Sequence, residues 1–325
     1  MARASQEAKG LKIPGSGGTA ELRRAAAVSL PFDELAKRAA RSSCSILITG
    51  ETGVGKGYLA RQLHANSPLA DGPFVPVNCG AIPETIVDSQ LFGHVKGSFS
   101  GATSDHLGLV RAAERGTLFL DEVGLLPPST QTRLLRLLQD REVQPVGHPR
   151  PIVVDLRVIA ATNSDLTEEV AAKRFREDLL FRLDVIRLPL RPLRERLDEI
   201  TGLVSMFNGE LAELYRQAEL EFDDAAMDVL KSYHWPGNIR QLRTVIERLH
   251  VLCPEDRVTA DRLIEVGQLR GADMSAGQPR SLEDVRYDEV RRVLEDAGGS
   301  VAQAAAVFGV HRSTVYRWLR SHGKP

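Results

Sequence analysis

The clearest chemical signal in the chain is a glycine-rich run that ends in a lysine. Residues 50–56 read GETGVGK and lie between the apolar stretch SILIT and a helical run. In such a loop, backbone N–H groups cradle phosphate oxygens and the lysine reaches the β- and γ-phosphates. The alternative, a plain glycine-rich turn, is disfavoured by this context. The predicted nucleotide-binding residues are Gly50, Glu51, Thr52, Gly53, Val54, Gly55, Lys56 and Gly57. Gly57 stands where the general pattern has a Ser or Thr that ligates Mg²⁺.

Two carboxylates and an amide follow two further apolar stretches. Thr117–Glu122 reads TLFLDE, and Asn163 ends the run AATN. A buried carboxylate pair is costly unless it serves a cation or a water, so we expect Asp121 to hold Mg²⁺ and Glu122 to activate the attacking water. Ligands gather at the carboxyl ends of parallel strands, where Asn163 would orient that water. The alternatives are a solvated strand end and an ordinary turn asparagine.

The pattern of apolar stretches predicts the elements that carry these groups. Strands alternate with helical stretches over residues 29–195, which is typical of a parallel α/β sheet. The expected strands are 45–49, 74–78, 117–120, 156–161 and 185–190, and the expected helices of a helical part at 196–265 are 198–215, 223–232 and 239–252. Residues 1–28 are expected to form a flexible tail, 266–280 a linker rich in Gly, and 281–325 a small helical module.

That last module is basic. Residues 298–325 contain Arg and Lys but neither Asp nor Glu, and a short helix, a turn at Gly309 and a second helix give a helix-turn-helix pattern. The expected partner is double-stranded DNA, and the alternative is an amphipathic helical hairpin. The expected base-edge contacts are His311, Arg312, Ser313 and Thr314, and the expected phosphate contacts are Arg317 and Arg320.

Composition limits the classes of protein that remain. The 325 residues are 42% hydrophobic and 26% charged with a net charge of −1, which is the profile of a soluble globular protein. Three scattered cysteines argue against a disulfide framework and for a reducing compartment. We see neither a signal peptide nor an apolar run of the roughly 20 residues that a membrane helix needs. A cytoplasmic location is therefore expected.

From about residue 29 to 265 the chain resembles the AAA+ domain of bacterial enhancer-binding proteins, which activate sigma-54 RNA polymerase. The resemblance is carried by GETGVGK, FVPVNCGAIPETIVDSQLFGHVKGSFSGA, GTLFLDEVGLLPPSTQTRLLRLLQ, AATN, FREDLLFRLDVIRLPLRPLRER and WPGNIRQL. It implies ATP and Mg²⁺ as cofactors, a sheet ordered 5-1-4-3-2, a helical lid and a ring, usually a hexamer. The stretch SVAQAAAVFGVHRSTVYRWLR resembles the family's Fis-type DNA-binding module. Gly57 departs from the acidic residue that the family commonly has there.

The resemblance also implies roles for four polar residues. Asn78 matches a polar switch that holds Glu122 until the γ-phosphate is sensed. Arg176 and Arg182 match arginines offered to the nucleotide of a neighbouring subunit, and Arg240 matches a lid arginine that reads the nucleotide of its own chain. A guanidinium supplied in trans offsets charge on the transferring phosphoryl group. The alternative for Arg176 and Arg182 is an ordinary basic helix face.

A second glycine-rich segment, residues 97–102, reads GSFSGA. Phe99 lies between small residues, so an exposed aromatic tip is expected, and the alternative is a hairpin folded onto the core. The segment resembles the family's GAFTGA loop, which engages sigma-54, with Ser98 for Ala and Ser100 for Thr. The expected contact residues are Gly97, Ser98, Phe99, Ser100, Gly101 and Ala102.

Two other functions remain open at this point: a DNA-binding regulator or repressor that does not contact sigma-54, and a DNA-remodelling motor. The loop and the terminal helix-turn-helix favour an activator that binds upstream DNA and remodels sigma-54 polymerase. Residues 1–28 are too few for a regulatory domain, so none is expected there. Regulation is therefore expected from an inhibitory partner protein, from expression level or from a paralogue in a hetero-oligomer; the homo-oligomer would range from a dimer to a hexamer.

Overall fold

The larger compact unit of the chain is built on a parallel sheet of five strands. The computed structural model describes residues 31–253, 257–269, 290, 293–294, 300–310, 312, 314–315 and 318. The sheet order is β2 (Phe74–Asn78), β3 (Thr117–Asp121), β6 (Arg157–Thr162), β1 (Ile46–Thr49) and β7 (Ile186–Pro189), with every neighbouring pair parallel. Taken along the chain, these strands have the order 5-1-4-3-2, which confirms the predicted fold class.

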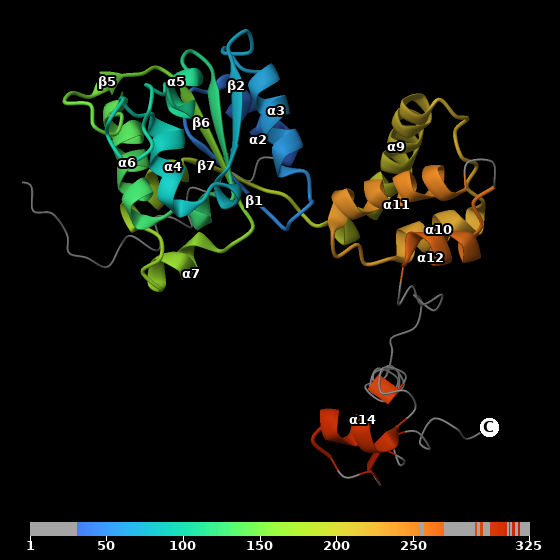
Figure 1. The fold of residues 1–325 in the computed structure, drawn as a ribbon. Coiled ribbons are helices and arrows are strands. Elements are labelled where there is room, and N and C mark those ends of the chain that lie inside the picture. Colours follow the sequence, from blue (N-terminus) through green and yellow to red (C-terminus); the bar gives the residue numbers. More distant parts are fainter. Residues whose placement is uncertain are drawn as a thin grey trace, which may run out of the picture. The chain divides into compact units, whose positions relative to one another are not determined.

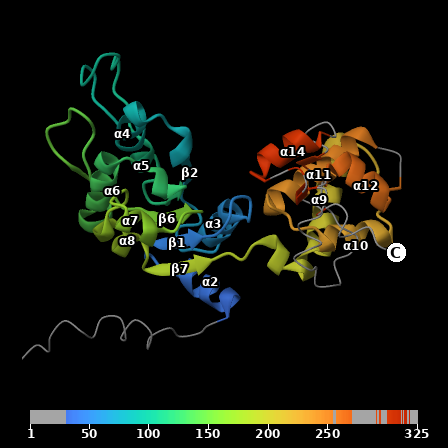
Figure 2. The ribbon, with the colours of Figure 1, turned by 90° about the horizontal axis from the view of Figure 1, so that it is seen from below.

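Alternate residues of the central strands are buried on opposite faces of this sheet. In β3, Leu118 and Leu120 pack into one apolar cluster and Phe119 into another. This is the period of two that a strand covered on both faces requires. The first face is covered by α4 (Glu84–Phe92), α5 (Leu109–Ala112), α6 (Pro128–Asp140), α7 (Leu166–Ala171) and α8 (Glu177–Leu183), and the second by α2 (Phe32–Arg41) and α3 (Lys56–Ala65), as Figures 1 and 2 show.

The expected strands lie where the apolar pattern put them, and β2 has its predicted bounds. The other four differ from prediction by a single residue at one end or at both. A short antiparallel hairpin, β4 (Glu142–Val143) and β5 (Ile152–Val153), was not predicted. Strands of two residues are too short to show a period in the sequence, which explains the omission.

The expected helices after residue 196 are also present. Helices α9 (Ile200–Tyr215) and α11 (Asn238–Leu252) belong to the larger unit, whereas α10 (Asp224–Ser232) and α12 (Ala260–Gly267) belong to the second. A buried polar contact joins the first two: the side-chain oxygen of Asn208 accepts the Leu220 amide at 3.0 Å and lies 2.9 Å from His250 Nε2. This contact fixes the pairing of α9 and α11 more specifically than apolar packing alone.

The described part of the C-terminal module has its own small core. Helix α14 (Val301–Val307) begins after Ser300, and Val290, Ala305 and Val315 are buried together. Gly309 has a φ of 62°, which explains the glycine in the turn. Arg312 is helical and exposed, and Thr314 is helical and partly buried. The predicted DNA contacts His311, Ser313, Arg317 and Arg320 lie outside the described residues, as do the tail 1–28 and most of the linker.

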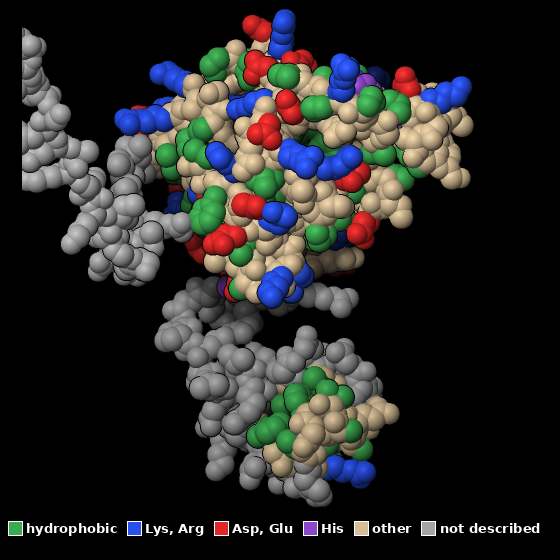
Figure 3. Space-filling model, turned by 90° about the vertical axis from the view of Figure 1, so that its left-hand side faces the viewer, with side chains coloured by type: hydrophobic (Ala, Val, Ile, Leu, Met, Phe, Trp, Pro, Cys, Tyr) green, Lys and Arg blue, Asp and Glu red, His purple; other side chains and the backbone are tan. Residues whose placement is uncertain are grey.

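Surface charge is mixed on the face that Figure 3 draws, where basic and acidic side chains alternate over the larger unit. This distribution agrees with the net charge of −1. Among the described residues, none of the helices combines the length and the apolar character that crossing a bilayer requires.

Leu118→Ala should lower the free energy of unfolding by about 3 kcal/mol, because the leucine is fully buried in β3 and its loss leaves a cavity. Leu214→Ala is the matched control, since Leu214 is 63% exposed. Urea unfolding monitored by circular dichroism measures both. Equal destabilisation by the two substitutions would contradict the packing described for β3.

Candidate nucleotide site

The glycine-rich loop joins the end of β1 to the start of α3 at Lys56. Gly53 and Gly55 have φ values of 78° and 105°, a region that residues with side chains rarely adopt. A Cβ added to Gly53 would lie 2.3 Å from the carbonyl oxygen of Gly237, so this position also needs glycine for lack of space. The loop is therefore folded against the main chain of residue 237.

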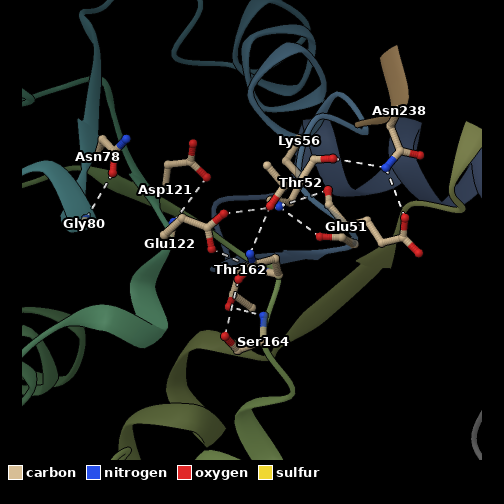
Figure 4. Close-up of polar contacts among 12 residues, drawn as sticks. Glu51, Thr52, Lys56, Asn78, Gly80, Asp121, Glu122, Thr162, Ser164 and Asn238 are labelled. Atoms are coloured by element: carbon tan, nitrogen blue, oxygen red, sulfur yellow. Dashed lines mark hydrogen bonds and ion pairs between the residues drawn. The ribbon is translucent and has the colours of Figure 1, made fainter. Parts of the chain in front are cut away.

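The Lys56 ammonium is held inside this loop. Its side chain is 6% exposed, and Nζ donates to the carbonyl oxygens of Gly50 at 2.9 Å and Glu51 at 3.3 Å. It also lies 3.5 Å from Glu122 Oε1 (Figure 4). The ammonium thus has oxygen acceptors from the loop and a carboxylate from β3, which is the arrangement in which a polyphosphate would replace the weaker partners.

The two acidic residues end β3 in different environments. Asp121 Oδ1 accepts the backbone N–H of Glu122 at 3.1 Å, and burial together with the neighbouring Glu122 charge raises the Asp121 pKa. Glu122 has a φ of 56°, a left-handed conformation that costs about 1 kcal/mol or more for a residue other than glycine. The strand turns sharply here, and the turn directs the Glu122 carboxylate towards Lys56.

Asn163 completes the cluster from β6. Its backbone N–H donates to Glu122 Oε2 at 3.1 Å, and its side-chain amide donates to Thr52 Oγ1 at 3.0 Å. One carboxylate is therefore bonded on both oxygens, and the loop, β3 and β6 are linked at a single edge of the sheet. The structure brings together the loop, Glu122 and Asn163 as the sequence predicted.

Asn78 does not make the contact that the resemblance implied. It lies opposite Asp121 in the β2–β3 register, but its side-chain oxygen accepts the Gly80 N–H at 3.0 Å. Glu122 is instead engaged by Lys56 and Asn163. The predicted contact of Asn78 with Glu122 is therefore absent from this conformation, because the Asn78 side chain caps the turn at Gly80 instead.

The three arginines are placed differently from one another. Arg176 forms a two-point ion pair with Asp178, at 3.0 and 2.7 Å, and this pairing raises the Arg176 pKa. Arg182 is exposed in the last turn of α8. Within the described part of the chain, neither guanidinium hydrogen-bonds to the glycine-rich loop. Arg240 is exposed beside the loop, and its backbone N–H donates to Gly53 O at 3.2 Å. Its charge opposes the net rise in the Asp121 pKa, as the smallest contribution.

The sequence missed the partners of Glu51. Arg194 donates to both of its carboxylate oxygens, at 2.9 and 2.6 Å, and Asn238 Nδ2 donates at 3.1 Å. These bonds lower the pKa of Glu51 to about 2. Arg194 lies 143 residues away along the chain, so no local pattern could have identified the pair.

The segment 97–102 forms a turn that is closed by the Gly97 N–H and the Ala102 carbonyl oxygen, 2.8 Å apart. Phe99 is 42% exposed and packs its ring edge against His94, with ring centroids 5.0 Å apart. A Cβ added to Gly97 or to Gly101 would meet no atom within 4 Å. Ala102 is only 7% exposed, so in this conformation its methyl group is buried, and its contact with a partner stays a prediction.

Sheet order, glycine-rich loop and acidic strand end together define a P-loop ATPase fold of the AAA+ class. Three family profiles match the chain: the Sigma-54 interaction domain over residues 25–189, the AAA+ ATPase lid domain over 194–278 and a Homeodomain-like domain over 283–323. The chain belongs to the family of proteins that carry the Sigma-54 interaction domain.

Named relatives are similar in sequence to this chain over part of their own length. The chain is 42% identical over 291 residues to the alginate biosynthesis transcriptional regulatory protein AlgB of Pseudomonas aeruginosa, covering 89% of this chain and 65% of AlgB. It is 42% identical over 277 residues to the transcriptional regulatory protein ZraR of Salmonella typhimurium, covering 85% of this chain and 63% of ZraR. The chain thus spans just under two thirds of these relatives.

Solved structures of NtrX from Brucella abortus share the fold. The complex with ATP has a TM-score of 0.66 and 32% identity, covering 97% of this chain and 70% of NtrX. The complex with ADP has a TM-score of 0.68 and 30% identity, covering 94% of this chain and 73% of NtrX. Nucleotide binding by a chain of this fold is thereby supported.

Lys56→Ala should abolish ATP binding, because it removes the buried ammonium that the loop holds for the phosphates. Lys37→Ala is the control, since Lys37 is an exposed lysine on α2. Equilibrium titration with a fluorescent ATP analogue measures both. Retention of wild-type affinity by Lys56→Ala would mean that the loop is not the phosphate site.

Proposed function

We propose that the chain hydrolyses ATP and uses the cycle to remodel sigma-54 RNA polymerase from an upstream DNA site. The observation that carries the proposal is the engagement of Glu122 by Lys56 and Asn163 at the edge of the sheet. A carboxylate held between the phosphate lysine and a backbone amide is positioned to act on a water beside the terminal phosphate.

The hydrolytic step uses residues that the fold brings together. As the polyphosphate engages Lys56, the ammonium exchanges its contacts with the loop carbonyls and with Glu122 for phosphate oxygens. Glu122 Oε1 is then free to accept a proton from the attacking water. Asn163, anchored to Thr52, orients that water. Asn78, one strand away, can take over Glu122 in another nucleotide state.

The residues present fit a magnesium ion held mainly by water and phosphate. Asp121 offers one carboxylate whose pKa is raised by burial, so a cation would be a favourable partner. Residue 57 offers no oxygen, and a Cβ placed there would meet only Phe119 at 3.8 Å. Mg²⁺ keeps several waters and is commonly bound by one or two carboxylates and substrate phosphates, so Asp121 alone is sufficient. The ion would offset charge on the transferring phosphoryl group.

In this proposal, a neighbouring subunit supplies a further positive charge, that of an arginine, to the nucleotide. Arg176 and Arg182 lie on or beside α8 without a bond to their own loop, and Arg182 is exposed. An oligomer would place these arginines at the nucleotide of the neighbouring subunit. It would be a homo-oligomer, from a dimer up to a hexameric ring, or a hetero-oligomer with a paralogue. The Arg176 pair with Asp178 would open on assembly. An inhibitory partner protein remains a candidate regulator.

The exposed turn at Phe99 is the proposed contact with sigma-54. A Cβ added to Gly97 or Gly101, the glycines at the two ends of the turn, would meet no atom within 4 Å, so there is open space beside both ends. Ser100 retains a hydroxyl, and Ser98 buries its Oγ without a hydrogen-bond partner among the described residues, which a rearrangement of the turn would relieve. The competing function is a DNA-binding regulator or repressor that uses the same fold without touching sigma-54.

The C-terminal module would deliver this ATPase to DNA. Arg312 is exposed on its second helix, where a base or phosphate contact is geometrically open. We propose the division 29–195, 196–265 and 281–325 for ATPase core, lid and DNA-binding module, with a tail at residues 1–28 before the core and a linker at 266–280 after the lid. With DNA and the polymerase as partners, the chain would act in the cytoplasm.

Phe99→Ala should abolish the complex with sigma-54 that forms in ADP–aluminium fluoride, because it removes the exposed apolar contact. Basal hydrolysis should persist. Ser100→Thr should strengthen the complex by about fourfold, the value of one buried methyl group. Co-migration of the two proteins in gel filtration is the measurement. If wild type and Ser100→Thr both hydrolyse ATP but fail to bind, the regulator that does not contact sigma-54 replaces the activator.

Mixing two inactive variants tests the arginines in trans. Arg182→Ala should lack the cation and Glu122→Gln the base, so each alone should be nearly inactive. In a mixed ring, some interfaces pair an intact Arg182 with an intact Glu122, and part of the hydrolysis should return. Steady-state ATPase rates at several mixing ratios measure this. No recovery in a demonstrated mixed oligomer would place Arg182 outside the reaction.

A further inference from the structure

Consecutive residues of the glycine-rich loop are bonded to two segments that are distant in the sequence, 193–196 and 237–240. The Asn238 amide donates to Thr52 O at 3.1 Å, the Arg240 N–H donates to Gly53 O at 3.2 Å, and the Arg196 guanidinium donates to Val54 O at 3.2 Å. Glu51 is held by Arg194. It is also held by Asn238, as Figure 4 shows. The loop conformation is thus imposed from outside the loop.

These bonds determine where the loop N–H groups point. In a planar trans peptide, the carbonyl of one residue and the N–H of the next point in opposite directions. Because the carbonyls of Thr52 and Val54 are held by Asn238 and Arg196, the N–H groups of the following glycines are turned away from these partners. Such N–H groups are those that an anion-binding loop needs free.

Glu51 is at the centre of this arrangement and is electrostatically unexpected there. A carboxylate in a loop that binds a polyanion repels the ligand, so it needs a compensating role. Its two-point pair with Arg194 lies next to Leu193, whose N–H donates to Asn238 Oδ1 at 2.8 Å. Asn238 is fully buried with a φ of 50°, so its side chain has a fixed position from which it joins both segments to the loop.

We propose that Glu51, Arg194 and Asn238 form a clamp that positions the glycine-rich loop for the polyphosphate before the nucleotide arrives. The three act as positioning residues: they touch the loop and each other, and the phosphates are bound by the loop they hold. This proposal rests on the proposed nucleotide-binding function. Preorganisation of this kind lowers the ordering cost that the ligand would otherwise meet.

The low Glu51 pKa, about 2, keeps the pair charged at every pH at which the chain would be assayed. The clamp is therefore a permanent scaffold, and a pH titration between 5 and 8 should leave its contribution unchanged. The side chains of Glu51 and Arg194 are 42% and 34% exposed, so both can be replaced without creating a buried cavity.

The competing explanation is simple attraction, with Arg194 acting as a nearby positive charge. The two explanations predict opposite signs for Glu51→Ala. Simple attraction predicts tighter ATP binding, because a negative charge is lost and Arg194 is freed to face the phosphates. The clamp predicts weaker binding, by about tenfold, because the loop loses its fixed conformation. Arg194→Ala should weaken binding under either explanation.

The experiment is an equilibrium titration of the full chain with a fluorescent ATP analogue for Glu51→Ala, Arg194→Ala and the double variant. The clamp predicts that the double variant binds no more weakly than either single variant, because they break the same contact. It also predicts a raised KM with a smaller change in kcat. Glu34→Ala and Arg38→Ala are matched controls, because that exposed pair lies in α2 and Glu34 is 45% exposed. These controls should bind as wild type.

Tighter binding by Glu51→Ala, or additive losses in the double variant, would overturn the clamp. Thermal unfolding of Glu51→Ala alongside Glu34→Ala separates a positioning effect from general destabilisation, and a loss of affinity fully matched by loss of folded protein would also count against it. Titration of wild type and of Lys56→Ala with the same analogue distinguishes a failure of the clamp proposal from a failure of the proposed nucleotide-binding function. If wild type binds no nucleotide, the function is wrong; if it binds and Glu51→Ala binds equally well, the clamp is wrong.

Discussion

The candidate nucleotide site depends on the oxygen atoms that hydrogen-bond to one buried ammonium group, that of Lys56. Lys56 is 6% exposed, and burying an ammonium is costly unless it is paired and hydrogen-bonded. Two loop carbonyls and the Glu122 carboxylate meet that requirement. The glycines, the left-handed conformation of Glu122 and the parallel sheet are all needed to bring those acceptors to one point. A polyphosphate satisfies the same ammonium better, which makes the site responsive to its ligand.

The order of the strands determines which groups can respond. Because β3 and β6 are neighbours and β1 follows β6, the carboxyl ends that carry Glu122, Asn163 and the loop converge. Thr52 and Asn163 then link the loop to β6 directly. Asn78 lies on the next strand, and α4 follows it before the chain reaches the exposed turn at Phe99. Elements of one apolar cluster, β2 and α4 among them, therefore lie along the chain between the phosphate site and that turn, and such packed elements can carry coupling.

Local sequence patterns were enough for the sheet, the loop and the acidic strand end. The apolar stretches fixed the five strands to within a residue at each end, because buried parallel strands are apolar throughout. The hairpin of β4 and β5 was not predicted, because strands of two residues show no hydrophobic alternation in the sequence. The clamp on Glu51 was missed for a different reason: Arg194 and Asn238 reach it only through tertiary folding. Asn78 shows the reverse case, since a motif implied a contact with Glu122 and the side chain is bonded to Gly80 instead.

In the proposed function, the nucleotide state sensed at Lys56 and Glu122 controls the conformation of the turn at residues 97–102. Hydrogen exchange of the amides in this turn, measured with ADP–aluminium fluoride and with ADP, tests it most directly. We expect the exchange of these amides to differ clearly between the two states in wild type and to be unchanged by either addition in Lys56→Ala. Identical exchange in both states of a wild-type protein that binds and hydrolyses ATP would contradict the coupling.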